Sequence, residues 1–170
     1  MIQFYKPNAK VTGTACSFYM NKQDGSFFST LIKQASWDEK RRIGKFDKDK
    51  KAIIKLSQLE IASLMNAIDS KVEFKGYHKS SQQVVQFSLA PSLKVVGAFT
   101  YSVTREASDD STNKTSFFLG LYANEAVLLR EHLQYLLHES FRLSDAKYSA
   151  PEAPKAKPEV NAREEDDMAW

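Results

Sequence analysis

The spacing of apolar and polar residues changes period twice along the chain, and both halves show the same order. In the first half, short runs of small, β-branched and aromatic residues predict strands at 10–20, 26–37 and 51–56. The charged segment DEKRRIGKFDKDK (38–50) separates the last two. The second half repeats the strand signal, and there the predicted strands are 71–80, 83–90, 95–106 and 115–122.

A helical period follows the strands in each half. Ser57 and Glu60 have the spacing of a capping box, in which each side chain binds the other residue's backbone amide. The helix that they begin has an apolar face formed by Ile61, Leu64, Met65 and Ile68. A longer helix is predicted from about 123 to 143. Its apolar side consists of Ala126, Leu129, Leu133, Leu136, Leu137 and Ser140–Phe141.

The two halves align when one is moved by 65 residues along the other. Leu56 then falls on Leu121, Glu60 on Glu125, Leu64 on Leu129 and Ile68 on Leu133. We therefore predict an α+β fold of two units, each with four strands and a helix, with antiparallel sheets packed on the two helices. The predicted domain is 1–145, with repeats 1–70 and 71–145, and a disordered acidic tail occupies 146–170.

Composition narrows the class of protein. Cys16 is the only cysteine, so one chain can form no disulfide and no cysteine-based zinc site. The sequence contains no phosphate-binding glycine loop, no supported Ser/His/Asp arrangement and no His-rich motif, so we expect no enzymatic activity, cofactor or metal. The N-terminus lacks the apolar core of a signal peptide, and no apolar stretch could span a membrane. We expect a soluble, cytoplasmic protein.

Charge is unevenly distributed between the body and the tail. The formal net charge is +3. Residues 146–170 contain four Lys/Arg and six Asp/Glu, whereas 1–145 contain 20 Lys/Arg and 15 Asp/Glu. A body of charge +5 and a tail of charge −2 suit a domain that binds a polyanion, although ordinary charge scatter would also give +5.

Aromatic and basic side chains occur together in several predicted strands. Single-stranded nucleic acid binds such a mixture, because each base offers a face for stacking and each link offers a phosphate charge. Strand aromatics also serve in cores and cross-strand packing, so the argument depends on the combination. The candidate DNA-binding residues are Lys10, Tyr19, Lys22, Phe27, Lys33, Trp37, Arg41, Arg42, Lys45, Tyr77, Lys79, Phe99, Tyr101 and Arg105.

The C-terminus ends in four consecutive acids followed by Met-Ala-Trp. Desolvating four carboxylates without partners is costly, so this tip does not belong to a core. A terminal aromatic suits a docking peptide better than a tail that serves only solubility.

The segments VTGTACSFYMN (11–21), DGSFFSTLIKQASWDEKRRIGKF (24–46), FKGYHKS (74–80) and the run from Asp110 to Phe141 carry a family resemblance. They resemble phage single-stranded DNA-binding proteins of the Whirly superfamily, related in fold to the positive-cofactor-four coactivators. This resemblance implies strand binding on the sheets without a cofactor. The tip is similar to the acidic tip of bacterial single-stranded DNA-binding proteins. That similarity implies that Asp166, Asp167 and Trp170 bind replication and recombination proteins.

We therefore expect a sequence-independent single-stranded DNA-binding protein that acts in phage DNA replication and recombination. The alternatives are a transcription coactivator or adaptor with the same fold that prefers duplex DNA or a polymerase, and an RNA-binding protein. Exposed strand edges would permit pairing between chains, so a homodimer is expected.

Overall fold

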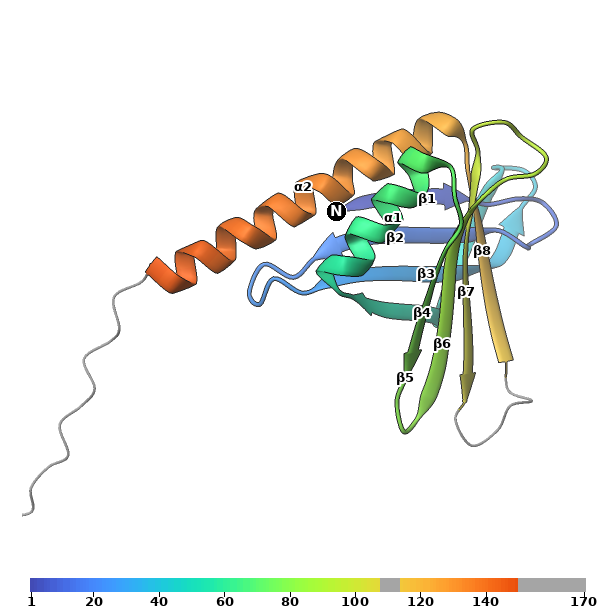
Figure 1. Cartoon of the computed structure of the whole chain (residues 1–170). Coiled ribbons are helices and arrows are strands. Elements are labelled where there is room, and N and C mark those ends of the chain that lie inside the picture. The colour runs from blue at the N-terminus through green and yellow to red at the C-terminus, as the bar shows by residue number, and fades with distance from the viewer. Residues whose placement is uncertain (108–113, 150–170) are drawn as a thin grey trace, which may run out of the picture.

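The computed structural model describes residues 1–107 and 114–149, and it contains two four-stranded antiparallel sheets and two helices (Figure 1). The first unit consists of β1 (Ile2–Lys6), β2 (Thr14–Met20), β3 (Phe27–Asp38), β4 (Ile43–Leu56) and α1 (Gln58–Ser70). The second consists of β5 (Phe74–Lys79), β6 (Gln83–Pro91), β7 (Phe99–Ala107), β8 (Lys114–Leu121) and α2 (Ala123–Ser149). Each sheet follows chain order, β1-β2-β3-β4 in sheet A and β5-β6-β7-β8 in sheet B. The predicted fold class is confirmed.

Sheet A differs from the prediction at both of its edges. The N-terminal segment forms β1, which the sequence pattern did not predict, and Phe4 on this strand is buried. Residues 43–50 of the charged segment belong to β4, which pairs with β3 from Ile43 onward. Its charges had hidden the strand, because β4 is an edge strand whose lysines point into solvent until the buried Ala52.

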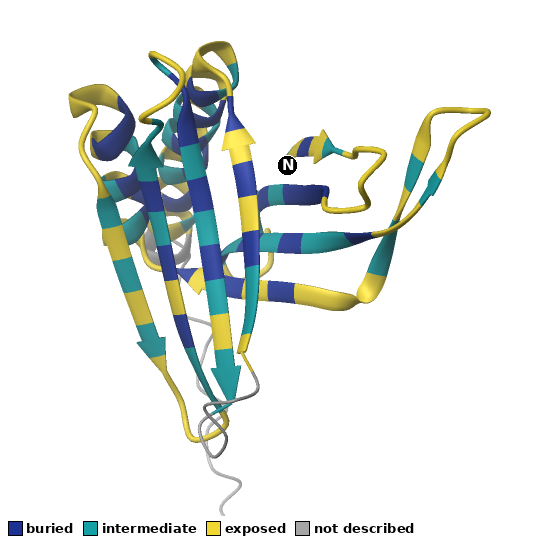
Figure 2. Cartoon of the chain, turned by 90° about the vertical axis from the view of Figure 1, so that its right-hand side faces the viewer, coloured by how far each residue is buried: buried dark blue, intermediate teal, exposed yellow. Residues whose placement is uncertain are grey.

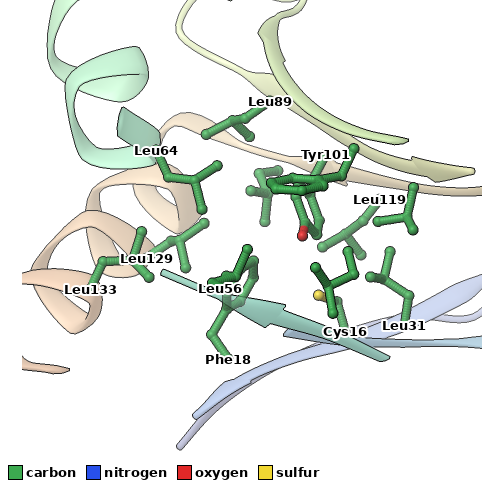
Figure 3. Close-up of a cluster of buried hydrophobic side chains, with 14 of the residues drawn as sticks. Cys16, Phe18, Leu31, Leu56, Leu64, Leu89, Tyr101, Leu119, Leu129 and Leu133 are labelled. Atoms are coloured by element: carbon green, nitrogen blue, oxygen red, sulfur yellow. The ribbon is translucent and has the colours of Figure 1, made fainter. Parts of the chain in front are cut away.

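One core fills the space between the inner faces of the two sheets and the helices (Figure 3). Leu64 on α1 and Leu129 and Leu133 on α2 are fully buried. Tyr101 is also fully buried, and its hydroxyl donates a hydrogen bond to Ser29 Oγ on the opposite sheet at 3.0 Å. This bond satisfies a polar group that would be costly to bury alone.

The core contradicts three of the predicted DNA contacts. Phe27, Phe99 and Tyr101 are no more than 4% exposed, and all three face the core. The alternation along β7 had been assigned to the wrong side, because Phe99, Tyr101 and Val103 form the inner row of sheet B. Phe27 and Phe28 point to opposite faces, as adjacent strand residues must, and Phe28 is the one that faces outward.

The 65-residue alignment places equivalent residues in equivalent environments. Leu56 and Leu121 are both buried at strand ends, and Leu64 and Leu129 occupy matching buried helix positions. Helix α2 continues to Ser149, past the predicted start of the tail at 146.

The helix N-termini join the two units reciprocally. The predicted capping box is present on α1: Glu60 accepts the Ser57 amide at 2.8 Å, and Ser57 Oγ accepts the Glu60 amide at 3.2 Å. On α2, Glu125 accepts the Tyr122 amide at 2.8 Å, so half of this motif persists without the serine.

Each of these glutamates also contacts the first strand of the other unit. Glu60 Oε1 lies 2.7 Å from His78 Nε2 on β5, and Glu125 forms an ion pair with Lys6 on β1. Burial opposes ionisation of Glu60, but hydrogen bonds from Ser57 and His78 outweigh it and hold its pKa below the ordinary value.

Candidate nucleic-acid interface

The outer face of sheet A combines stacked aromatic rings with lysines. The register of β2 and β3 places Tyr19 directly opposite Phe28, and their ring centroids are 5.5 Å apart with planes 22° from parallel. Phe28 in turn lies opposite Lys55 on β4, and Lys51 lies on the same face two pairs further along. The surface formed by Tyr5, Tyr19, Phe28, Phe46, Lys51 and Lys55 is called the aromatic face below.

A recess of about 180 Å³ opens in the aromatic face. Its floor includes Ala15 and Ile32, and Tyr5 and Phe46 stand beside it with ring centroids 5.8 Å apart. Lys48 also lines the recess. An apolar floor beside aromatic rings and a cation suits a nucleobase together with its phosphate.

The distal part of the β3–β4 hairpin extends this basic surface away from the core (Figure 2). Its exposed tip carries Lys40, Arg41 and Arg42, and Lys45 follows on β4. Trp37 on β3 is only partly exposed, and its indole Nε1 is buried without a hydrogen-bond partner among the described residues.

Gln34 anchors the base of this hairpin. The pairing of β3 with β4 shifts register on both sides of Gln34, which bends the strand. The Gln34 side chain accepts the amides of Asn8 and Gly13 at 2.9 and 3.2 Å. It also donates to the carbonyls of Asn8 and Ser36 at 2.9 and 3.0 Å. One amide therefore ties the bulged strand to the β1–β2 loop.

The outer face of sheet B has a different character. Hydroxyl side chains pair between neighbouring strands, Ser88 on β6 with Ser102 on β7 at 2.9 Å and Thr104 on β7 with Ser116 on β8 at 3.0 Å. Tyr77 on β5 and Phe118 on β8 are 57% and 62% exposed on the two edge strands. This face therefore has short polar residues in the middle and an aromatic residue at each edge.

The structure distributes the remaining predicted contacts over these surfaces. Tyr19 lies on the aromatic face and Lys22 in the exposed β2–β3 turn, whereas Tyr77 and Lys79 lie on the outer face of sheet B. The hairpin carries Trp37, Arg41, Arg42 and Lys45, and Lys10 is exposed in the β1–β2 loop.

Two of the predicted DNA-binding residues interact with other residues of the protein. The Lys33 ammonium lies 5.3 Å from the centroid of the Phe117 ring. Arg105 shares the parity of the inner row on β7 and donates to the Lys51 carbonyl at 3.5 Å. Both are therefore attached to the junction of the two sheets.

Several residues of the aromatic face were not predicted from the sequence. Tyr5 lies on the unpredicted β1, and Phe46 lies in the charged segment, so neither belonged to a predicted strand. Phe28, Lys51 and Lys55 could have been found from strict alternation once Phe27 had been assigned to the core.

Other predictions concern chemistry away from these faces. Burial strongly raises the pKa of the Cys16 thiol, which suits a core residue and not a nucleophile. Within 1–107 and 114–149, no three His, Cys, Asp or Glu side chains are grouped to hold a metal ion. Over the same ranges, no helix is long and apolar enough to cross a membrane. Asp166, Asp167 and Trp170 lie outside the described residues.

The arrangement of two crossed sheets with paired helices is similar to that of several solved structures, although no family model and no curated protein matches the sequence. WHY3 from Arabidopsis thaliana superposes with a TM-score of 0.64 at 13% identity, covering 87% of this chain and 92% of that one. The chain has the Whirly fold. The plant transcriptional regulator PBF-2 gives a TM-score of 0.64 at 13% identity, with coverages of 89% and 88%. MRP1/MRP2 of Trypanosoma brucei gives 0.63 at 14% identity, with coverages of 84% and 86%.

Proposed function

We propose that this Whirly-fold protein binds single-stranded DNA on the aromatic face, largely without regard to sequence and without catalysing a reaction. The observation that carries the proposal is the Tyr19–Phe28 stack on a face that also presents Lys51 and Lys55. Stacking of a base on an aromatic ring contributes roughly 1–3 kcal/mol and tolerates any base. Lysines add a salt-dependent contribution through release of counterions from the strand.

The basic hairpin extends the same binding surface. Arg41, Arg42 and Lys45 would contact phosphates of a strand that leaves the aromatic face along β3 and β4. The net charge of +5 on residues 1–145 favours the approach of any polyanion, so specificity for single strands must come from the aromatic rings.

We further propose a role in phage DNA replication and recombination in the host cytoplasm, with recruitment of enzymes through the C-terminal tip. The support is the sequence of the tip, in which four acids precede Met-Ala-Trp. The same acids would compete with DNA for the basic surface. Deleting 163–170 should therefore leave DNA binding unchanged or tighter while partner binding is lost, and weaker DNA binding would contradict the competition. The unpaired outer edges of the sheets make a homodimer compatible with this role.

The binding test is a fluorescence-anisotropy titration of a labelled, unstructured thymidine oligonucleotide. We expect micromolar or tighter binding that weakens steeply as salt is added. Absence of binding at low salt would overturn the proposal.

The competing function is regulation of transcription through duplex DNA, and it is favoured by the similarity to PBF-2, described as a plant transcriptional regulator. Competition of the bound oligonucleotide with duplex DNA and with single-stranded RNA separates the alternatives. A clear preference for the duplex favours the regulator, and a clear preference for RNA identifies an RNA-binding protein.

A further inference from the structure

The outer face of sheet B contains a recess of about 320 Å³ whose lining can form directional hydrogen bonds. Ser88, Ser102 and Thr104 line it from the central strands, and Tyr77 and Gln86 line it from β5 and β6. The recess on sheet A, in contrast, has an apolar floor and aromatic neighbours. The two faces therefore offer different chemistry to a strand.

We propose that the sheet B recess is an adenine-binding subsite in which Tyr77 stacks on the base and Gln86 binds its hydrogen-bonding edge. The inference rests on the proposed strand binding and deepens it, because it adds one base-selective position to an interface that otherwise tolerates any sequence.

The strand register brings the required groups together. Tyr77 and Gln86 are direct partners across β5 and β6, so their backbones are about 4.7–4.9 Å apart. Tyr77 is 57% exposed, and Gln86 is exposed as well. A base stacked on the Tyr77 ring would therefore lie beside the Gln86 amide. No hydrogen bond within the described part of the chain occupies that amide.

The position of the lysines completes a nucleotide site. Lys79 lies two residues from Tyr77 on the same face of β5, about 6.6–6.8 Å away along the strand, within reach of an adjoining phosphate. Lys75, on the other side of Tyr77, pairs with Glu73 at 3.1 Å. The hydrogen-bonding edge of the base would thus meet Gln86 and its face would stack on Tyr77. The phosphate would meet Lys79.

The lining favours adenine over the other bases. A glutamine amide presents a donor and an acceptor together, and these match the N6 amino group and N7 of adenine. Guanine offers two acceptors on the corresponding edge and is better read by a free arginine or lysine, but Lys75, the lysine that lines the recess, is paired with Glu73. Thymine offers only the O4 acceptor beside its methyl group on that edge, and cytosine offers only the N4 donor, so neither base satisfies both groups of the Gln86 amide.

Mononucleotides test the subsite directly, because they bind it without needing a continuous strand. The full-length, 15N-labelled protein is titrated with the 5′-monophosphates of the four deoxynucleosides, and chemical shifts are followed by NMR. We expect deoxyadenosine monophosphate to shift the resonances of Tyr77, Thr104 and the Gln86 side-chain amide. Its Kd should be about tenfold below that of thymidine monophosphate, the discrimination expected of one good bidentate contact.

Three variants assign the preference to the recess. Gln86→Ala should remove the difference between nucleotides, whereas Gln82→Ala, an exposed glutamine in the β5–β6 turn, should leave it unchanged. Tyr77→Ala should weaken binding of all four nucleotides. The 15N spectrum of each variant verifies its fold.

Equal binding of the four nucleotides, or a preference that survives Gln86→Ala, would overturn the subsite. The oligonucleotide titration gives an independent result. A chain that binds thymidine oligonucleotides but shows no adenine preference loses only the subsite. One that selects deoxyadenosine monophosphate but binds no oligonucleotide loses the proposed strand binding.

Discussion

Replacing Gln34 with leucine tests whether one buried amide holds the basic hairpin to the rest of sheet A. The Gln34 side chain makes four hydrogen bonds and is only 6% exposed. Each such bond contributes a net ~0.5–1.5 kcal/mol, so their sum lies between about 2 and 6 kcal/mol. The groups of Asn8 and Ser36 can regain water because both residues are exposed, whereas the buried Gly13 amide cannot. We therefore expect Gln34→Leu to lower the free energy of unfolding by about 3 kcal/mol.

Urea denaturation and thermal melting measure this loss. For a chain of this size, about 3 kcal/mol corresponds to a Tm lower by roughly 6–12 °C. The matched control is Gln23→Leu at an exposed glutamine in the β2–β3 turn, which should change stability by less than about 0.5 kcal/mol. A Gln34→Leu protein as stable as the control would refute the reasoning.

Gln34→Glu provides a second test, through the pH dependence of its stability. The carboxylate would keep the acceptor but face the carbonyls of Asn8 and Ser36 where the amide now donates. Its folded-state pKa should be raised, so the variant should gain stability as the pH falls and lose it as the pH rises through that pKa. A Gln34→Glu stability that does not change with pH would argue against the assigned donor and acceptor roles.

Three further predictions concern other parts of the fold. Ser29→Ala should lower the free energy of unfolding in urea by about 1–3 kcal/mol, because the buried Tyr101 hydroxyl loses its partner. Adding Tyr101→Phe to this variant should lower it little further, whereas additive losses from the two substitutions would contradict the hydrogen bond. Gly76→Ala should destabilise by about 1–3 kcal/mol, since a Cβ there would overlap the Phe87 ring, whereas Gly120→Ala on β8 has open space and should be neutral. Glu60 should stabilise the fold above its ordinary pKa of 4.5, and this stabilisation should be lost as the pH falls through its lowered folded-state pKa. The urea midpoints of Glu60→Gln should therefore lack that part of the acid dependence.

Much of the fold follows from local signals in the sequence. Ser57 and Glu60 identify the start of α1, and the apolar spacing of Leu129 and Leu133 identifies the buried side of α2. These signals are local because capping and helical periodicity involve residues within one turn. Edge strands give weaker signals, since only one side is paired and their outward residues remain polar. For this reason β1 and the first half of β4 were missed.

The candidate site was harder to predict, because alternation along a strand defines two faces but does not say which one is inside. Tyr101 and Phe99 had the composition of a stacking surface and proved to be core residues. The pairing of Tyr19 with Phe28 depends on the β2–β3 register, and that of Tyr5 with Phe46 depends on a strand and a bulged segment without clear sequence signals. These pairs of residues on different strands could therefore be identified only from the structure.

The salt dependence of strand binding tests the central claim most directly. Lys51→Ala/Lys55→Ala removes two cations from the aromatic face, and Lys94→Ala, in the β6–β7 loop, serves as the control. Each phosphate contact contributes about 0.7 to the slope of log K against log salt for single strands. The double variant should therefore bind a labelled thymidine oligonucleotide more weakly, with a slope shallower by about 1.4, while the control keeps the wild-type slope. An unchanged slope and affinity in the double variant would contradict strand binding on this face.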